Sequence, residues 1–126
     1  MVRHCLFALT LLVFATGAEA ASQPRKLSAK EIRQRFIGKV ITDSAHWHYY
    51  LKPNGSIDAD ELNRARKGHW RLEGDRLCIT IIAGAAPDEC WDVAQDGKHL
   101  TFGTYGEVTY WVKVEPPPKQ AHRAKR

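Results

Sequence analysis

The spacing of hydrophobic and polar positions changes at Gly38, and this change divides the chain into two kinds of structure. Before Gly38, Ile32 and Phe36 lie four residues apart, as on one face of a helix. After Gly38, short runs rich in β-branched and aromatic residues alternate with polar residues, as in strands that bury one face. The chain therefore predicts a short N-terminal helix followed by β structure.

The helix is predicted over residues 29–37. Ser28 can cap its first turn, Glu31 completes a capping box three residues later, and Leu27 can pack against Ile32. We expect Gly38 to end the helix, because glycine readily adopts the left-handed conformation found beyond helix C-termini.

Turn residues interrupt the rest of the chain about every ten positions. The alternating runs predict strands over 39–42, 46–52, 56–58, 69–72, 76–81, 90–94, 98–103 and 107–114. The polar stretch 59–67 does not alternate and is predicted to be a loop. Because nearly every connection is short, we expect an all-β domain. It would be a small antiparallel meander of seven or eight strands, closed or half-closed into a barrel and preceded by the short helix.

Residues 1–20 have the organisation of a secretory signal peptide. Arg3 and His4 give a basic start, residues 6–17 form an apolar stretch, and Ala18-Glu19-Ala20 supplies the small residues that signal peptidase requires. We expect cleavage near Ala21 and a periplasmic or secreted mature chain. No later stretch approaches the ~20 apolar residues of a membrane span, so we expect no transmembrane segment after cleavage. The alternative is an uncleaved membrane anchor.

The positive charge is concentrated at the two ends of the mature chain. The 126 residues carry 19 Lys and Arg against 14 Asp and Glu, a net charge of +5. Residues 21–35, the basic segment with the helix start, carry +4, and the Pro-rich tail 116–126 carries +4, whereas the predicted barrel, 36–115, carries −3. The bases of the tail are Lys119, Arg123, Lys125 and Arg126. We expect the tail to be disordered and to bind anionic envelope surfaces, with added solubility as the alternative role.

A nucleic-acid partner is not expected, although the chain is basic. An exported protein does not meet cytoplasmic nucleic acid, and the aromatic residues of this chain do not interleave with Arg and Lys in one patch.

Two cysteines, Cys78 and Cys90, remain after removal of the signal, which contains Cys5. An even pair in an exported chain predicts a disulfide. If Cys78 stands opposite Cys90, the odd-numbered positions of both strands form the apolar face, so the disulfide belongs to the outer face or an edge. The spacing is not that of a redox pair, and a reactive thiol is the less favoured alternative.

His46-x-His48 has a spacing suited to metal binding, because alternate residues of a strand share a face. A third ligand is required, and His69 is the candidate. The competing interpretation, which we favour, is a pair of solvent-facing imidazoles without a tightly bound metal.

Six aromatic residues fall on the predicted inward face: Trp47, Tyr49, Trp70, Trp91, Phe102 and Tyr110. In a small barrel such residues either fill the core or line a ligand cavity, and the short chain favours the core. Tyr50 and Trp111 fall on the outward face instead, where large aromatic residues are typical of protein interfaces.

Catalysis is not expected, and neither is a cofactor. The acidic residues Asp58, Asp60, Glu61, Asp88 and Glu89 lie in or beside predicted turns and loops. A Gly-x-Ser-x-Gly nucleophile motif is absent from the sequence.

Several short motifs occur in an informative order: Leu27-Ser28-x-x-Glu31-Ile32, Gly38-Lys39, Tyr49-Tyr50-x-x-Pro53-Asn54-Gly55-Ser56, Gly68-x-Trp70, Gly74-Asp75-x-Leu77-Cys78, Cys90-Trp91 and Asp96-Gly97. In this order they resemble a group of small exported α-proteobacterial proteins whose function is not established. The resemblance covers about residues 27–103. It implies a periplasmic β domain with one disulfide and no catalytic residue. Gly68-x-Trp70 also resembles the lipocalin motif, which lipocalins carry on their first strand, and it implies a lipocalin-like shape.

These features together predict a monomeric periplasmic binding or interaction protein, either inhibitor-like or associated with the envelope. Its partner would be a protein or an anionic envelope component. The alternative is a carrier that holds a small ligand in the barrel interior or a metal at His46 and His48.

Overall fold

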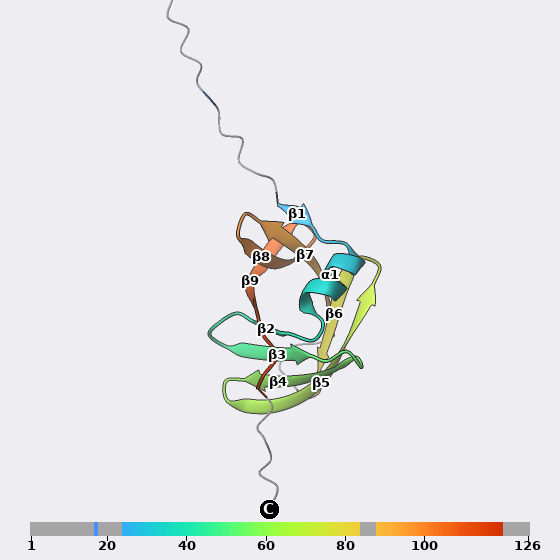
Figure 1. Ribbon diagram of the computed structural model, residues 1–126, viewed down its shortest axis with the longest axis vertical. Helices are drawn as coiled ribbons and strands as arrows, with labels where there is room; N and C mark the ends of the chain where they lie inside the picture. The colour runs from blue at the N-terminus through green and yellow to red at the C-terminus, as the bar shows by residue number, and fades with distance from the viewer. Residues whose placement is uncertain (1–16, 18–23, 84–87, 120–126) are drawn as a thin grey trace, which may run out of the picture.

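The computed structural model describes Gly17, residues 24–83 and residues 88–119 (Figure 1). The predicted signal peptide and the tail beyond Lys119 lie outside the described residues, apart from Gly17. The elements are β1 (Arg25–Lys26), α1 (Ala29–Phe36), β2 (Val40–Thr42), β3 (Trp47–Leu51), β4 (Ser56–Glu61), β5 (Arg64–Glu73), β6 (Arg76–Ile81), β7 (Glu89–Asp96), β8 (His99–Thr104) and β9 (Glu107–Glu115).

Strands β2 to β9 form a closed eight-stranded barrel. Each pairs antiparallel with the next along the chain, and β9 returns to pair with β2, so the sheet has no free edge between them. The short β1 is an extra strand that pairs with the last part of β7. The predicted all-β meander is therefore confirmed, in its closed form.

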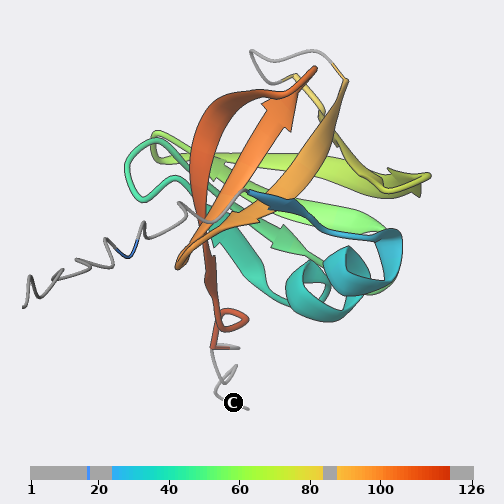
Figure 2. The same ribbon diagram turned by 90° about the horizontal axis from the view of Figure 1, so that it is seen from above.

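The two ends of the barrel differ. At one end lie the turns between β3 and β4, β5 and β6, and β7 and β8, together with α1. We call this the helix end. At the other, the loop end, lie the connections 43–46, 62–63 and 105–106, together with the described residues 82–83 and 88 between β6 and β7. In Figure 2 the helix lies at the lower right, and the loops before β3 and after β4 lie on the opposite side.

The predicted capping box holds α1 at the helix end. The Glu31 backbone N–H donates to Ser28 Oγ, the Ser28 backbone N–H donates to the Glu31 carboxylate, and the Ala29 N–H donates to Asp75 Oδ1 in the β5–β6 turn. Ile32 and Phe36 are fully buried, so the helix covers the core of the barrel at this end. Gly38 has φ +82° and follows the helix as expected.

The interior is a single apolar cluster that runs from α1 through the inward faces of the strands. Gly68 allows β5 to approach β6 closely, because a Cβ at this position would lie 2.2 Å from the Thr80 carbonyl oxygen. Trp70, two residues on, is buried, donates its Nε1–H to the Lys52 carbonyl at 2.8 Å and lies under the Arg33 guanidinium.

Two expectations about the strands are wrong. Residues 59–67 are not a loop, because β4 extends to Glu61 and β5 begins at Arg64, with Leu62 and Asn63 as a two-residue turn. Arg25 and Lys26 form β1, which the sequence pattern did not indicate. The remaining strands lie within two residues of their predicted bounds.

Candidate functional site

The turns at the loop end have an unusual backbone. Among the described residues, those other than glycine with positive φ are Ser44, Leu62, Asn63, Ala83 and Tyr105. All five belong to loop-end connections, whereas the helix-end turns place Gly55, Gly74 and Gly97 at their left-handed positions. A left-handed conformation is costly for residues with a Cβ, and most of all for bulky ones. Such residues cluster at functional sites, which makes the loop end a candidate site.

Large hydrophobic side chains are exposed at the same end. Leu62 is 68% exposed, Ile82 59% and Tyr105 97%, and the first part of β9 adds Val108 and Tyr110. They stand on different turns and strands of this end, and large apolar side chains left exposed to water at one end of a small domain favour an interaction surface there. We call these five residues the apolar rim.

Beneath the rim, aromatic rings form a continuous series through the barrel. It starts at Phe36 of α1 and continues through Phe102, Trp91, Tyr110 and Trp47 to Tyr49, with neighbouring ring centroids 4.7–6.2 Å apart. Exposure is 0% at Phe36, 2% at Phe102 and 9% at Trp91, reaches 39% at Tyr110, and falls again to 9% at Tyr49. Of the six aromatic residues predicted to face inward, Tyr49, Trp70, Trp91 and Phe102 lie in the core and Trp47 packs against it, whereas Tyr110 is 39% exposed while its ring contacts Trp91 and Trp47. All but Trp70 belong to this series. They fill the interior between α1 and the rim.

A polar group lies inside the barrel near the rim. The Tyr49 hydroxyl donates to Glu61 Oε2 at 2.9 Å, and Arg66 Nε lies 3.9 Å from Glu61 Oε1. Arg66 Nε is buried and has no hydrogen-bond partner in the structure. Burial, and then the hydrogen bond to Glu61, raise the pKa of Tyr49 well above its usual value, so Tyr49 stays protonated as a donor. The interior at the loop end is therefore part aromatic and part charged.

Asp43 organises the loop before β3. Its Oδ1 accepts backbone N–H groups of Ala45, His46 and Trp47, and its Oδ2 lies 2.7 Å from His46 Nδ1. Burial acts to raise the pKa of this carboxyl, but the donors outweigh it and hold the pKa far below the usual value. The loop is thus fixed by one carboxylate rather than by glycine.

The three candidate metal ligands do not come together. His46 and His48 line a hollow of about 300 Å³ on the outer surface, together with Asp60. His69 stands opposite Ser56 and Thr80, in the middle of β5, and does not line this hollow. His69 is therefore wrongly placed to be the third ligand, and the favoured interpretation of the pair, no tightly bound metal, stays a prediction.

The predicted disulfide between Cys78 and Cys90 is present, and the two residues are direct partners in the β6–β7 ladder. It lies on the outer face, as expected, although Cys78 is fully buried. Glu73 lies beside it, and its carboxylate and the two sulfur atoms are within 4.8 Å of one another. Because the sulfurs are bonded to each other, they offer no thiolate to a metal ion.

The residues predicted to bind surfaces are spread over the outside. Trp111 is 55% exposed on β9 and packs edge-on against His99. Tyr50 and Lys119 line a hollow of about 750 Å³ beside the outer face of β3. Arg123, Lys125 and Arg126 lie outside the described residues.

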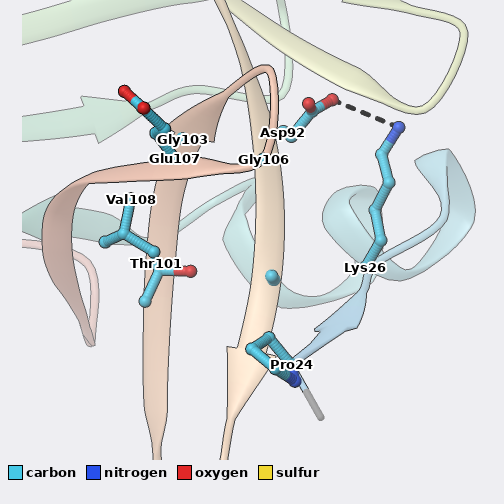
Figure 3. Close-up of a pocket in the computed structure, with 9 residues that line it drawn as sticks. Pro24, Lys26, Asp92, Thr101, Gly103, Gly106, Glu107 and Val108 are labelled. Carbon is cyan, nitrogen blue, oxygen red and sulfur yellow. Dashed lines mark ion pairs between the residues drawn. The ribbon is translucent and has the colours of Figure 1, made fainter.

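A further outer hollow of about 300 Å³ lies between β1 and the β8–β9 hairpin (Figure 3). Figure 3 shows Lys26 and Asp92 facing each other at its side, with Nζ and Oδ1 3.2 Å apart. Its lining includes the small residues Ala94, Thr101 and Gly103. Lys26 and Asp92 also line this hollow, but their charges are paired with each other.

Sequence reasoning missed the apolar rim. A signal was present in Leu62 and Tyr105, which are single large apolar residues between polar or glycine neighbours in turns. Such residues are rarely accommodated at turn centres without a reason beyond folding.

The described part of the chain contains no helix that is both long and apolar enough to cross a membrane. Comparisons of the chain with protein-family models, with curated proteins and with solved structures yield no match.

Proposed function

We propose that this protein is a periplasmic interaction protein that binds another protein through its apolar rim, in the manner of an inhibitor that presents loops to an enzyme. The observation that carries the proposal is the exposure of Leu62 and Tyr105 on turns held in left-handed conformations. Folding alone favours glycine or asparagine at such positions, so bulky apolar residues there point to selection for contact.

The partner's surface should be apolar at its centre and basic around it. Asp60 and Glu107 flank the rim, and neither forms an ion pair with another described residue. Interfaces commonly surround an apolar centre with polar residues of complementary charge. The closed barrel supplies a rigid support, which lowers the entropic cost of binding by presenting preformed loops.

A second candidate function is association with an anionic envelope component through the helix end. Lys30, Lys39 and Lys98 lie at this end and form no ion pair with any residue that the structure describes. The basic tail begins there as well, because β9 ends at Glu115 on the same side. Clustered cations of this kind attract anionic surfaces in a salt-dependent way.

The rim can be tested with a double variant, Leu62→Asn and Tyr105→Asn. Asparagine tolerates the left-handed conformation, so the turns should keep their shape while the apolar contacts are lost. Immobilised wild-type protein should retain a specific periplasmic protein, and the double variant should not. Trp111→Asn is the matched control, because it removes an exposed aromatic residue from the barrel wall and should leave retention unchanged. Equal retention by wild type and double variant would contradict the proposal.

A further inference from the structure

Two histidines and one carboxylate line the same outer hollow next to the β4–β5 turn. His48 is a direct ladder partner of Asp60, with the side chains of both on the outer face of the barrel. His46 precedes His48 by two residues, and its carbonyl accepts the Leu62 N–H at 2.9 Å, so the β3–β4 pairing continues to this position. All three residues line the hollow of about 300 Å³.

In place of the interpretation favoured from the sequence, a histidine pair without a tightly bound metal, we propose that His46, His48 and Asp60 bind one Zn²⁺ ion, with water as the fourth ligand. Two imidazoles and one carboxylate are a ligand set that zinc accepts in tetrahedral geometry. Directly opposed residues on paired strands have Cβ atoms about 5 Å apart, and alternate residues of one strand lie about 7 Å apart, so one ion can reach all three side chains.

Asp43 prepares His46 for this role. A carboxylate at neutral pH has no proton to donate, so the 2.7 Å contact places the proton on His46 Nδ1. The free electron pair is then on Nε2, the other nitrogen of a ring whose side chain is 69% exposed. A carboxylate that holds the far nitrogen of a ligand histidine is a common arrangement at zinc sites, where it fixes the ring and strengthens the ligand.

His48 and Asp60 are exposed, so the site can close by rotation of these two side chains toward the His46 ring, which Asp43 holds. Their donor atoms do not all lie within 4.8 Å of one another in this structure. His48 and Asp60 are on strands and His46 is fixed by Asp43, so closure requires no change in the backbone. The hollow borders the rim at Leu62 and shares Asp60 with its flank, but zinc binding does not require a protein partner at the rim.

The test is calorimetric titration of the intact mature protein with zinc chloride at neutral pH. We expect one ion per chain. His48→Ala and Asp60→Asn should each abolish or strongly weaken binding, and Asp43→Asn should weaken it about tenfold or more by releasing the His46 ring. His69→Ala is the matched control, because His69 is also an exposed histidine on the outer wall but lies away from the hollow. It should bind zinc as the wild type does.

A second readout separates the site from nonspecific binding. Cobalt(II) titrated in place of zinc should give the intense visible absorption of a tetrahedral site, and this absorption should disappear in His46→Ala. No binding by the wild type would overturn the proposal. So would equal losses in His69→Ala and His48→Ala, or an octahedral cobalt spectrum unchanged by His46→Ala.

Discussion

At the scale of single residues, the protein concentrates unfavourable backbone conformations at one end. Leu62 has φ 51° and Tyr105 has φ 52°, and both side chains point into water. The left-handed conformation costs about 1–2 kcal/mol of stability for a residue with a Cβ. Because both side chains are exposed, their burial does not offset this cost. Leu62 and Tyr105 thus lower the stability of the fold at positions where the proposed function requires bulky apolar side chains.

The residues of the rim should therefore show a trade-off between stability and binding. We predict that Leu62→Asn and Tyr105→Asn each raise the free energy of unfolding, by about 0.5 kcal/mol or more, as measured by urea denaturation. Trp111→Asn, at an exposed position in a regular strand, should give no such gain. A loss of stability in both rim variants would mean that Leu62 and Tyr105 serve the fold.

Tyr49 should make the barrel sensitive to alkaline pH. The pKa of Tyr49 is raised in the folded state, so folding favours the protonated phenol. This contribution is complete below the unfolded pKa of about 10 and is lost as the pH rises from there through the folded pKa. We predict that wild-type stability falls above about pH 10 more steeply than that of Tyr49→Phe, measured by urea denaturation.

Tyr105→Phe provides the control for this pH dependence. Tyr105 is 97% exposed, so a variant without its hydroxyl should lose stability at alkaline pH to the same degree as the wild type. Identical pH profiles for wild type and Tyr49→Phe would show that the buried hydroxyl and Glu61 are not coupled to folding.

At the scale of elements, the β6–β7 hairpin depends on its disulfide. The connection between these strands is the longest in the barrel, and Cys78 and Cys90 are separated by 12 residues. Closing a loop of this size contributes roughly 3 kcal/mol in the chain-entropy model. We predict that a Cys78→Ser, Cys90→Ser variant loses about this amount in urea denaturation under oxidising conditions.

Reduction supplies the check on the disulfide prediction. Dithiothreitol should lower the stability of the wild type to a similar degree and leave the double serine variant unchanged. If the reductant has no effect on the unfolding of the wild type, the bond does not hold the hairpin.

The elements that sequence analysis predicted well are those whose burial follows the pattern of their strand. The helix was predictable because Ser28 and Glu31 form a capping box at its start. The register of β6 and β7 followed from the alternation of Leu77 and Ile79 with Cys78. In these segments local propensity and burial agree, so the pattern is sufficient.

The β4–β5 hairpin was missed because its inward face is charged. Glu61 and Arg66 point into the barrel. They are held there by the hydrogen bond from Tyr49 to Glu61 and by the attraction between their own charges, in place of apolar contacts. The alternation that marks a strand is therefore absent from residues 59–67, and the turn has Leu62 where glycine or asparagine would have marked it. Residues 59–67, which the sequence pattern did not identify as strands, border the candidate site. Departures of this kind from local sequence preferences are expected near functional sites.

At the scale of the whole molecule, the two ends of the barrel differ in charge. The loop end carries the acidic residues Asp60 and Glu107 beside the apolar rim, and the helix end carries Lys30, Lys39 and Lys98. An anionic surface would attract the helix end and repel the loop end. The two proposed functions are thus compatible, because a protein attached at its helix end would present the rim away from the surface.

This orientation leads to a prediction about binding to lipid vesicles. Deleting residues 119–126 should weaken retention on vesicles that contain anionic lipid, because each base near such a surface contributes about 1 kcal/mol. Lys30→Gln combined with Lys39→Gln should weaken it further, since both lie at the same end of the barrel. Retention is measured by sedimentation at low salt, and the melting temperature should not change with the deletion.

Two controls test whether the protein binds the vesicle in one orientation or only through its overall positive charge: a change of salt concentration, and removal of a base at the loop end. Raising the ionic strength to the physiological range should reduce retention, because the Debye length falls to about 8 Å and screens exposed cations. Arg64→Gln removes an exposed base at the loop end and should have little effect if the helix end faces the vesicle. If Arg64→Gln weakens retention as much as Lys30→Gln, the protein has no preferred orientation. If the truncated chain binds as well as the full chain at low salt, the tail is not the anchor, and the outward-facing Trp111 becomes the next residue to test.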